Sequence, residues 1–174
     1  NLPTWAGWVL PYDQPIALVF DELDHFTEAV THLIRVGLDR IEGYLDGGIG
    51  AWLGAAHPVR SLGTLDVAEL SRRRGEYRIL DVRSDAEYSA GHIEGAIYIH
   101  GGIRQDHLSR IPRDRSLAVV CGSGYRASIA ASVLLRAGFR DVWNVLGGMG
   151  AWKAAGYPQQ RSGEPAGKSF WRIS

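Results

Sequence analysis

The 174-residue sequence contains a single cysteine, carries no net charge and has no long apolar run. One cysteine excludes a disulfide within the chain and a zinc site built from several thiolates, which predicts a reducing, cytoplasmic location. Nineteen basic and nineteen acidic residues leave no electrostatic footprint for nucleic acid. No stretch approaches the ~20 apolar residues of a membrane-spanning helix, so neither nucleic acid nor membrane is expected as a partner.

The six histidines show neither an HxH nor an HExxH spacing. We therefore predict that this chain holds no metal ion and no other cofactor. Hydrophobic residues make up 45% of the sequence and charged residues 22%. These are the proportions of a globular protein with a sizeable core.

The only cysteine lies between a predicted strand and a predicted helix. The apolar run 117–120 predicts a short buried strand that ends at Cys121. Two glycines and an arginine follow, and the small apolar residues of 127–137 then predict a packed helix. A thiol in this position meets backbone N–H groups and the positive end of a helix dipole. The position favours the nucleophilic thiolate and any anion that it forms.

The sequence also contains an internal repeat. Each copy reads in order as a strand, a loop, a helix, a glycine stop, a short strand, a Gly-Gly turn and a short helix. We predict a partial copy in residues 1–59, a complete domain in residues 60–160 and a loosely wrapped or docked tail in residues 161–174. The matched segments are 16–20 with 117–121, 34–38 with 135–139, and 45–52 with 145–152.

The two copies differ at the position of the cysteine. Phe20 occupies the place of Cys121, and the acidic segment 21–25 follows where the second copy is glycine-rich. A phenylalanine cannot attack sulfur or phosphorus, and carboxylates repel an anionic substrate, so the first copy is predicted to be inactive. Residues 62–105 have no upstream counterpart. We therefore expect the chain to begin partway through a domain of a longer protein.

The front part of the second copy carries local signals for helices and strands. Two capping-box spacings predict helix starts, and two short apolar segments predict strands. Strands that alternate with helices predict an α/β domain with a central, mostly parallel sheet flanked by helices. In such a sheet the ligand site lies beyond the carboxyl ends of the strands, where Cys121 falls. The boxes are Asp66–Glu69 and Ser84–Glu87, and the strands are 77–82 and 97–99.

Five motifs occur in a fixed order: LDVR at 80–83, EY at 87–88, GHIEGA at 91–96, CGSGYR at 121–126 and GGMGAW at 147–152. Together they resemble the rhodanese family over about residues 62–160, which implies a rhodanese-like fold. The first copy is similar to the back half of an inactive rhodanese-like domain. An inactive copy before an active one, opening with Trp5-Ala6-Gly7-Trp8, resembles the C-terminal region of fusions to a metallo-β-lactamase-fold persulfide dioxygenase or hydrolase. That metal-binding domain would be a partner.

The resemblance implies a sulfurtransferase that carries a persulfide on Cys121. The thiolate takes the outer sulfur of a small donor, thiosulfate or a persulfide, and the sulfur then passes to a thiol or cyanide. Asp81 and Arg83 are expected to pair or cap beneath the loop. We interpret them, together with His92 and Glu87, as support for the fold and not as participants in the chemistry.

The residues that follow the cysteine are predicted to form an anion-binding loop. Gly122 and Gly124 let successive N–H groups turn inward, because no Cβ stands in the way. Ser123 adds a hydroxyl donor, and Arg126 holds the anionic donor or the persulfide. Tyr125 either shapes the mouth of the site or is a surface aromatic.

Two other functions fit part of these features. Cysteine phosphatases and arsenate reductases also cradle oxyanions in a Cys-(x)n-Arg loop, but the cysteine phosphatases have five intervening residues, and this loop has four. The shorter loop makes a smaller cradle, which suits a sulfur atom better than a phosphoryl group. The alternative from another class is a non-catalytic module that docks an upstream metallo-β-lactamase-fold domain.

Overall fold

The computed structural model describes residues 2–100 and 105–161. The chain divides into two compact units, residues 1–61 and residues 62–174, and each is considered by itself. The predicted tail lies, from residue 162 on, outside the described residues. Among the described residues, no helix is both long and apolar enough to cross a membrane.

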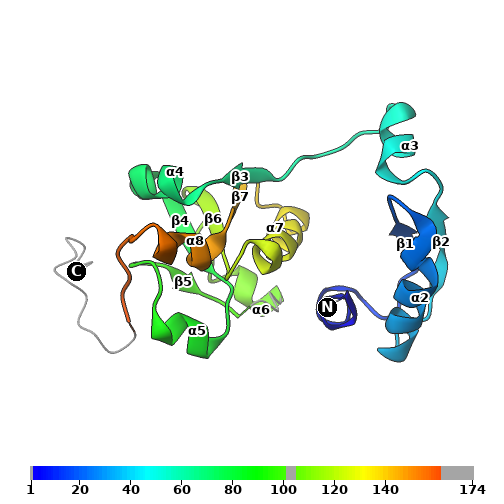
Figure 1. Cartoon of the computed structure of the whole chain (residues 1–174), viewed down its shortest axis with the longest axis horizontal. Coiled ribbons are helices and arrows are strands. Elements are labelled where there is room, and N and C mark those ends of the chain that lie inside the picture. The colour runs from blue at the N-terminus through cyan, green and yellow to red at the C-terminus, as the bar shows by residue number, and fades with distance from the viewer. Residues whose placement is uncertain (1, 101–104, 162–174) are drawn as a thin grey trace. The chain divides into compact units, whose positions relative to one another are not determined.

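The second unit is built on a five-stranded sheet in the order β3-β7-β6-β4-β5, and every pair in it is parallel. This confirms the predicted α/β class with a parallel central sheet. The strands are β3 (Gly63–Leu65), β4 (Tyr77–Asp81), β5 (Ile97–Tyr98), β6 (Ser116–Val120) and β7 (Val142–Val145) (Figure 1). The α-helices are α4 (Val67–Arg72), α5 (Asp85–Ala90), α6 (Gln105–Leu108), α7 (Tyr125–Arg136) and α8 (Gly148–Ala154), and a 3-10 turn, η2, spans Arg74–Glu76.

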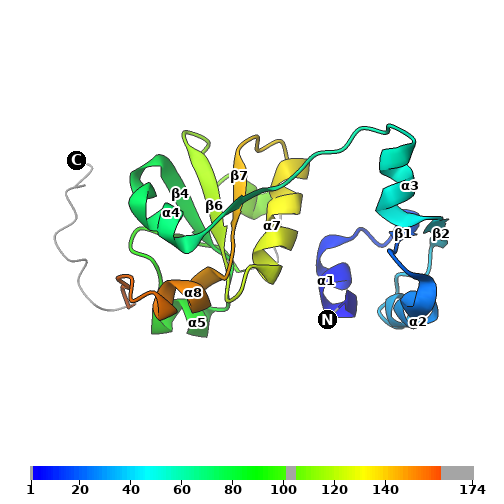
Figure 2. The same ribbon diagram turned by 45° about the horizontal axis from the view of Figure 1, so that its top comes forward.

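The central strand β6 separates two hydrophobic cores because its side chains alternate between the faces of the sheet. Leu117 and Val119 join the core on the face of α7, and Ala118 and Val120 join the core on the face of α4 and α8. Figure 2 shows α4 and α7 on opposite sides of the strands. The small residues of α7 let it pack closely on the sheet, and the buried ones are Ala127, Ala130, Ala131 and Leu134.

Local capping signals start two of the helices where the sequence predicts. The Asp66 side chain accepts from the backbone N–H of Glu69 at 2.7 Å and begins α4. Ser84 and Glu87 form a complete capping box at the start of α5. Helix α4 ends at Arg72, and the exposed Arg73 that follows bonds Glu69 and Glu76.

The first unit is smaller and has one two-stranded parallel sheet. Its core consists of Ala6, Leu33 and Leu38 with a few half-buried neighbours, and helix α1, which the sequence did not predict, packs on α2. The elements are α1 (Leu2–Val9), β1 (Ile16–Val19), a 3-10 turn η1 (Leu23–His25), α2 (Phe26–Arg35), β2 (Ile41–Leu45) and α3 (Gly48–Gly54). The order β1-α2-β2-α3 is the same as β6-α7-β7-α8 in the second unit.

The Gly-Gly turns before α3 and α8 have nearly the same conformation. The φ angles are 71° and 56° at Gly47 and Gly48, and 72° and 51° at Gly147 and Gly148. A Cβ on Gly48 would overlap the carbonyl oxygen of Phe20, as a Cβ on Gly148 would overlap that of Cys121. In both units the indole N–H bonds the carbonyl of the proline six positions further along the chain: Trp52 to Pro58 at 3.2 Å and Trp152 to Pro158 at 2.9 Å.

Candidate active site

Cys121 follows β6 directly, at the carboxyl edge of the parallel sheet, and only 1% of its surface is exposed. The start of α8 holds the backbone around it. The N–H of Met149 donates to the Cys121 carbonyl at 2.7 Å, and the N–H of Gly150 donates to the Gly122 carbonyl at 2.9 Å. The turn can approach this closely because Gly148 has no Cβ and adopts a left-handed φ. The Gly-Gly turn therefore fixes the position of the cysteine.

The sulfur of Cys121 lies at the N-terminus of α7. The backbone N–H of Gly124 donates to Sγ at 3.1 Å. Gly124 is also the N-cap of α7, with a φ of 106° that side-chain-bearing residues rarely adopt. Helix N-termini and converging N–H groups stabilise negative charge, so this geometry suits an anionic sulfur species. The expectation drawn from the strand-loop-helix pattern agrees with this placement, although α7 begins at Tyr125, two residues earlier than predicted.

Arg126 in the first turn of α7 is held by Glu87 of α5. Two bonds join them, from Nη1 to Oε2 at 2.7 Å and from Nη2 to Oε1 at 2.6 Å. The bonds from Arg126 are the main cause that lowers the pKa of Glu87 to about 2; burial opposes this shift, and the bonds with Ser84 contribute to it. The Glu87 bond is the main cause that raises the pKa of Arg126, with a smaller contribution from Cys121. The guanidinium is therefore held in place by the carboxylate of Glu87.

Asp81 and Arg83 form a buried ion pair, as the sequence suggested. Arg83 Nε donates to Asp81 Oδ1 at 2.9 Å and Nη2 donates to Oδ2 at 2.7 Å. Nη2 also donates to the Gly91 carbonyl at 2.8 Å, which ties the pair to the end of α5. His92 stacks on Tyr88 with ring centroids 3.8 Å apart. These contacts support the connection from β4 to α5, and none of them involves a residue of the loop that begins at Cys121.

The remaining loop residues are exposed. Tyr125 has 53% of its surface exposed, and Ser123 is also exposed. Among the residues that the structure describes, none bonds the Ser123 hydroxyl, and its donor role stays a prediction. Gly122 leaves room for Arg126, because a Cβ there would lie 3.0 Å from Nη2.

Sequence reasoning missed one buried polar residue near the loop. Asn144 of β7 is only 7% exposed, and its Oδ1 has no hydrogen-bond partner among the described residues. A Cβ built on Gly124 would lie 3.7 Å from this oxygen, so Asn144 lies beneath the N-cap of α7. The available signal was an amide within the otherwise apolar strand 142–145.

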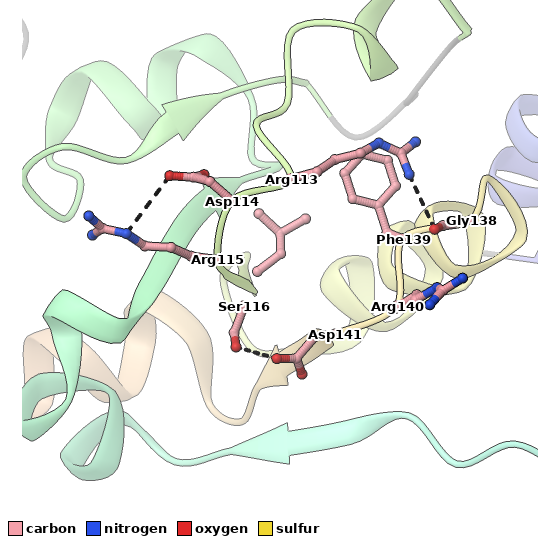
Figure 3. A pocket seen from close by; sticks show the side chains of 9 residues that line it. Arg113, Asp114, Arg115, Ser116, Gly138, Phe139, Arg140 and Asp141 are labelled. Carbon is pink, nitrogen blue, oxygen red and sulfur yellow. Dashed lines mark hydrogen bonds and ion pairs between the residues drawn. The ribbon is translucent and has the colours of Figure 1, made fainter.

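The described residues contain no group of three side chains that could ligate a metal ion. A cavity of about 460 Å³ lies away from Cys121, at the amino ends of β6 and β7 (Figure 3). Structural contacts occupy much of its lining. Arg113 stacks over Phe139 at 3.8 Å, and Asp141 accepts bonds from Ser116 and from Trp143. This cavity therefore does not belong to the cysteine site.

The fold and the loop define an α/β domain that presents a buried cysteine to a helix N-terminus. The sequence model of the rhodanese-like domain family matches residues 66–155 of this chain. The chain belongs to the rhodanese-like domain family. A rhodanese-related protein of Thermoplasma volcanium is 30% identical with a TM-score of 0.53, over 56% of this chain and 97% of that one. The rhodanese-like domain of an Anabaena protein is also 30% identical with a TM-score of 0.53, over 66% of this chain and 92% of that one.

Related sequences carry different names. A sulfurtransferase of Allochromatium vinosum is 32% identical over 54% of this chain and 91% of its own length. A thiosulfate sulfurtransferase of Pseudomonas putida is 34% identical over 53% of this chain and 82% of its own length. An HTH-type transcriptional regulator of Mycobacterium tuberculosis is 39% identical over 58% of this chain, which spans only 45% of that regulator. The domain is thus homologous to sulfurtransferases and also occurs within a regulator.

Proposed function

We propose that this chain is a sulfurtransferase that carries sulfane sulfur on Cys121. The observation that carries the proposal is the Gly124 N–H on Sγ at the start of α7, 3.1 Å away. The Cys121 thiolate attacks the outer sulfur of thiosulfate or of a persulfide. A Cys–S–S⁻ persulfide forms, and sulfite or a thiolate leaves with the electrons of the broken S–S bond. A thiol or cyanide then attacks the outer sulfur, and the Cys121 thiolate returns.

The loop composition supports this chemistry over phosphoryl transfer. Four residues separate Cys121 from Arg126, and two of them are glycines. The N–H groups of Met149 and Gly150 donate to the carbonyls of Cys121 and Gly122, which fixes the backbone at the start of the loop. An incoming sulfur needs one open position next to Sγ, whereas a phosphoryl group needs room for three equatorial oxygens. Relatives named as sulfurtransferases add independent support.

Mass spectrometry tests the proposal directly. Incubation with thiosulfate or glutathione persulfide should add one sulfur atom to Cys121, and cyanide should remove it as thiocyanate. The Cys121→Ser variant should fold normally yet take up no sulfur, because its hydroxyl ionises far less readily than a thiol. Absence of the adduct with both donors, together with turnover of a phosphate ester, would replace this proposal with phosphatase or arsenate chemistry.

We further infer that residues 1–59 are a partial, inactive copy of the domain at 60–160, with a scaffold role. Exposure supports this. Val19, Ile49 and Trp52 are 56%, 47% and 36% exposed, whereas Val120, Met149 and Trp152 at the matched positions are each 1% exposed. In the second unit the core formed with β3, α4 and β4 covers these positions. The first unit has no counterpart of those elements among the described residues.

The open face of the first unit gives this inference a test. A cavity of about 540 Å³ lies on it, lined by residues of β1, β2 and α3. An environment-sensitive dye such as anilinonaphthalene sulfonate should bind there, and Val19→Ser with Ile49→Ser should reduce its fluorescence, whereas Val59→Ser, outside the cavity, should not. If encoded residues before Asn1 supply the missing half, a longer protein should shield Trp52 from a soluble quencher. Equal quenching of Trp52 in both proteins would contradict the partial-copy interpretation.

The wider setting rests on the sequence resemblance. We infer a cytoplasmic protein, as the single cysteine suggests, that acts on small sulfur donors and thiol acceptors. The fusion to a metallo-β-lactamase-fold domain is inferred from the inactive-then-active order and the opening segment 5–8. A docking role without chemistry predicts that Cys121→Ser leaves the function of the whole protein unchanged. The sulfur-loading experiment and this variant therefore separate the two roles.

A further inference from the structure

The cation of the cysteine loop is not free in this structure. Both terminal nitrogens of Arg126 are bonded to the carboxylate of Glu87, at 2.7 and 2.6 Å. Two parallel bonds of this kind form the strongest arrangement between a guanidinium and a carboxylate. A donor that needs Arg126 must either compete with Glu87 or bind beside a pair whose charges already offset each other.

The pair lies against the loop and not at a distance from it. A Cβ on Gly122, the residue after the cysteine, would lie 3.0 Å from Arg126 Nη2 and 3.8 Å from Glu87 Oε1. The other ion pair nearby, Asp81 with Arg83, is buried and internally neutral. Glu87 therefore offsets the charge of Arg126 beside the loop, and a donor that approaches Cys121 meets a carboxylate as well as the guanidinium.

Donors differ in the charge that they bring to this position. Thiosulfate is a dianion whose charge is shared between the sulfane sulfur and the three oxygens on the neighbouring sulfur. An organic persulfide brings at most one negative charge on its reacting sulfurs. Because the unfavourable interaction with a fixed carboxylate grows with the donor's charge, Glu87 disfavours the dianion more than the monoanion. The same carboxylate reduces the attraction that Arg126 can offer.

We propose that Glu87, by holding Arg126, makes the Cys121 site select organic persulfides over thiosulfate as sulfur donors. This inference rests on the proposed sulfurtransferase function and names its donor class. Glu87 acts here as a positioning and charge-setting residue. It forms no bond with the donor and changes which donor Arg126 can attract.

Glutamine is the right substitution because Glu87 also has a structural task. Its Oε2 accepts from the backbone N–H of Ser84 at 3.1 Å and from the Ser84 hydroxyl at 2.9 Å, within the capping box. Glutamine serves at the same position of a capping box, so Glu87→Gln removes the charge and retains the helix start. Glu87→Asp is the matched control, since it keeps the charge and shortens the side chain.

The experiment measures kcat and KM for thiosulfate and for glutathione persulfide, with cyanide as the common acceptor and thiocyanate as the product. Glu87→Gln should raise kcat/KM for thiosulfate on the order of tenfold, mainly through a lower KM, because it removes a negative charge that lies several ångströms from the donor. Its kcat/KM for glutathione persulfide should rise only about threefold, because the interaction energy is proportional to the charge on the reacting group, so the donor ratio shifts about threefold toward thiosulfate. Glu87→Asp should keep the original ratio.

Three results would overturn the proposal. The first is an equal fall for both donors in Glu87→Gln, which would make Glu87 a purely structural support. The second is an unchanged donor ratio. The third is a ratio that shifts as far in Glu87→Asp as in Glu87→Gln, because charge would then not be the cause. If the unsubstituted protein loads no sulfur from either donor, the proposed function itself fails, and that outcome is distinct from these three.

Discussion

Replacement of Gly148 by alanine tests whether the Gly-Gly turn positions the cysteine. Gly148 has a φ of 51°, in the left-handed region. An added Cβ would overlap the carbonyl oxygen of Cys121 and lie 2.9 Å from the carbonyl carbon of Gly122. Carbon atoms in good contact are about 3.5–4.0 Å apart, so the loop or the turn has to move.

The size of the effect follows from two contributions. A left-handed conformation costs an alanine about 1–2 kcal/mol, and overpacking of a tight site costs about 1–3 kcal/mol. Together they predict that Gly148→Ala lowers the free energy of unfolding of the second unit by about 2–5 kcal/mol. The loop carrying Cys121 would also shift, and a displacement of ~1 Å at a reacting group can reduce turnover by about a hundredfold.

Two glycine variants serve as matched controls. Gly156→Ala has a similar φ of 71° but no atom within 4 Å of its Cβ, so it isolates the conformational cost of about 1–2 kcal/mol. Gly48→Ala reproduces the overlap in the first unit, on the carbonyl of Phe20, and should leave sulfur transfer by Cys121 unchanged. Urea unfolding and hydrogen exchange at the amides of β6 and β7 give the stability of the second unit. If Gly148→Ala costs no more than Gly156→Ala, the turn does not hold the cysteine.

Two further predictions concern the ion pairs. Asp81→Asn should lower the free energy of unfolding of the second unit, measured in urea, by about 3–5 kcal/mol, because it leaves the buried Arg83 charge unpaired. Asp114→Asn, at the exposed pair with Arg78, should change that free energy by less than about 1 kcal/mol. Equal effects would refute the assignment of burial as the cause. The folded-state pKa of Glu87, about 2, lies below its ordinary value of 4.5, so its contribution is fully present above about pH 4.5 and is lost as the pH falls toward 2. The Glu87 side chain is 38% exposed, so we expect the free energies of unfolding of the original protein and of Glu87→Gln to differ by under about 1 kcal/mol at pH 6. The difference should be smaller at pH 3. A larger difference at pH 3 would contradict the predicted direction of the pH dependence.

The features that sequence reasoning predicted depend on short stretches of chain. Ser84 and Glu87 are three residues apart and form their capping box as expected. Cys121 falls at the end of β6 because an apolar run stops there and glycines follow. The start of α7 was placed two residues late, since the left-handed Gly124 is the N-cap and Tyr125 is already helical.

The features that it missed depend on which distant elements become neighbours. Arg126 and Glu87 are 39 residues apart, and nothing in either motif indicates that α5 delivers the carboxylate to α7. Strand β3 has only three residues and is recognisable chiefly by its pairing with β7. The burial of Asn144 beneath the N-cap likewise follows from the order of the strands. Contacts of this kind require the strand order, which local periodicity does not contain.

The two units show which residues of the site the scaffold requires. The Gly-Gly turn and the indole-to-carbonyl bond occur in both units. The turn of the first unit lies against the carbonyl of Phe20, and the turn of the second lies against the carbonyl of Cys121. These shared features therefore serve folding, and by themselves they give no evidence of chemistry. The left-handed Gly124, its N–H on the buried sulfur, and the arginine held by Glu87 belong to the second unit. The first unit forms the same turn with Phe20 in place of the thiol and without a left-handed glycine after it, so the turn itself does not require these two residues. The function is therefore best sought in Cys121, its loop and the carboxylate that restrains Arg126.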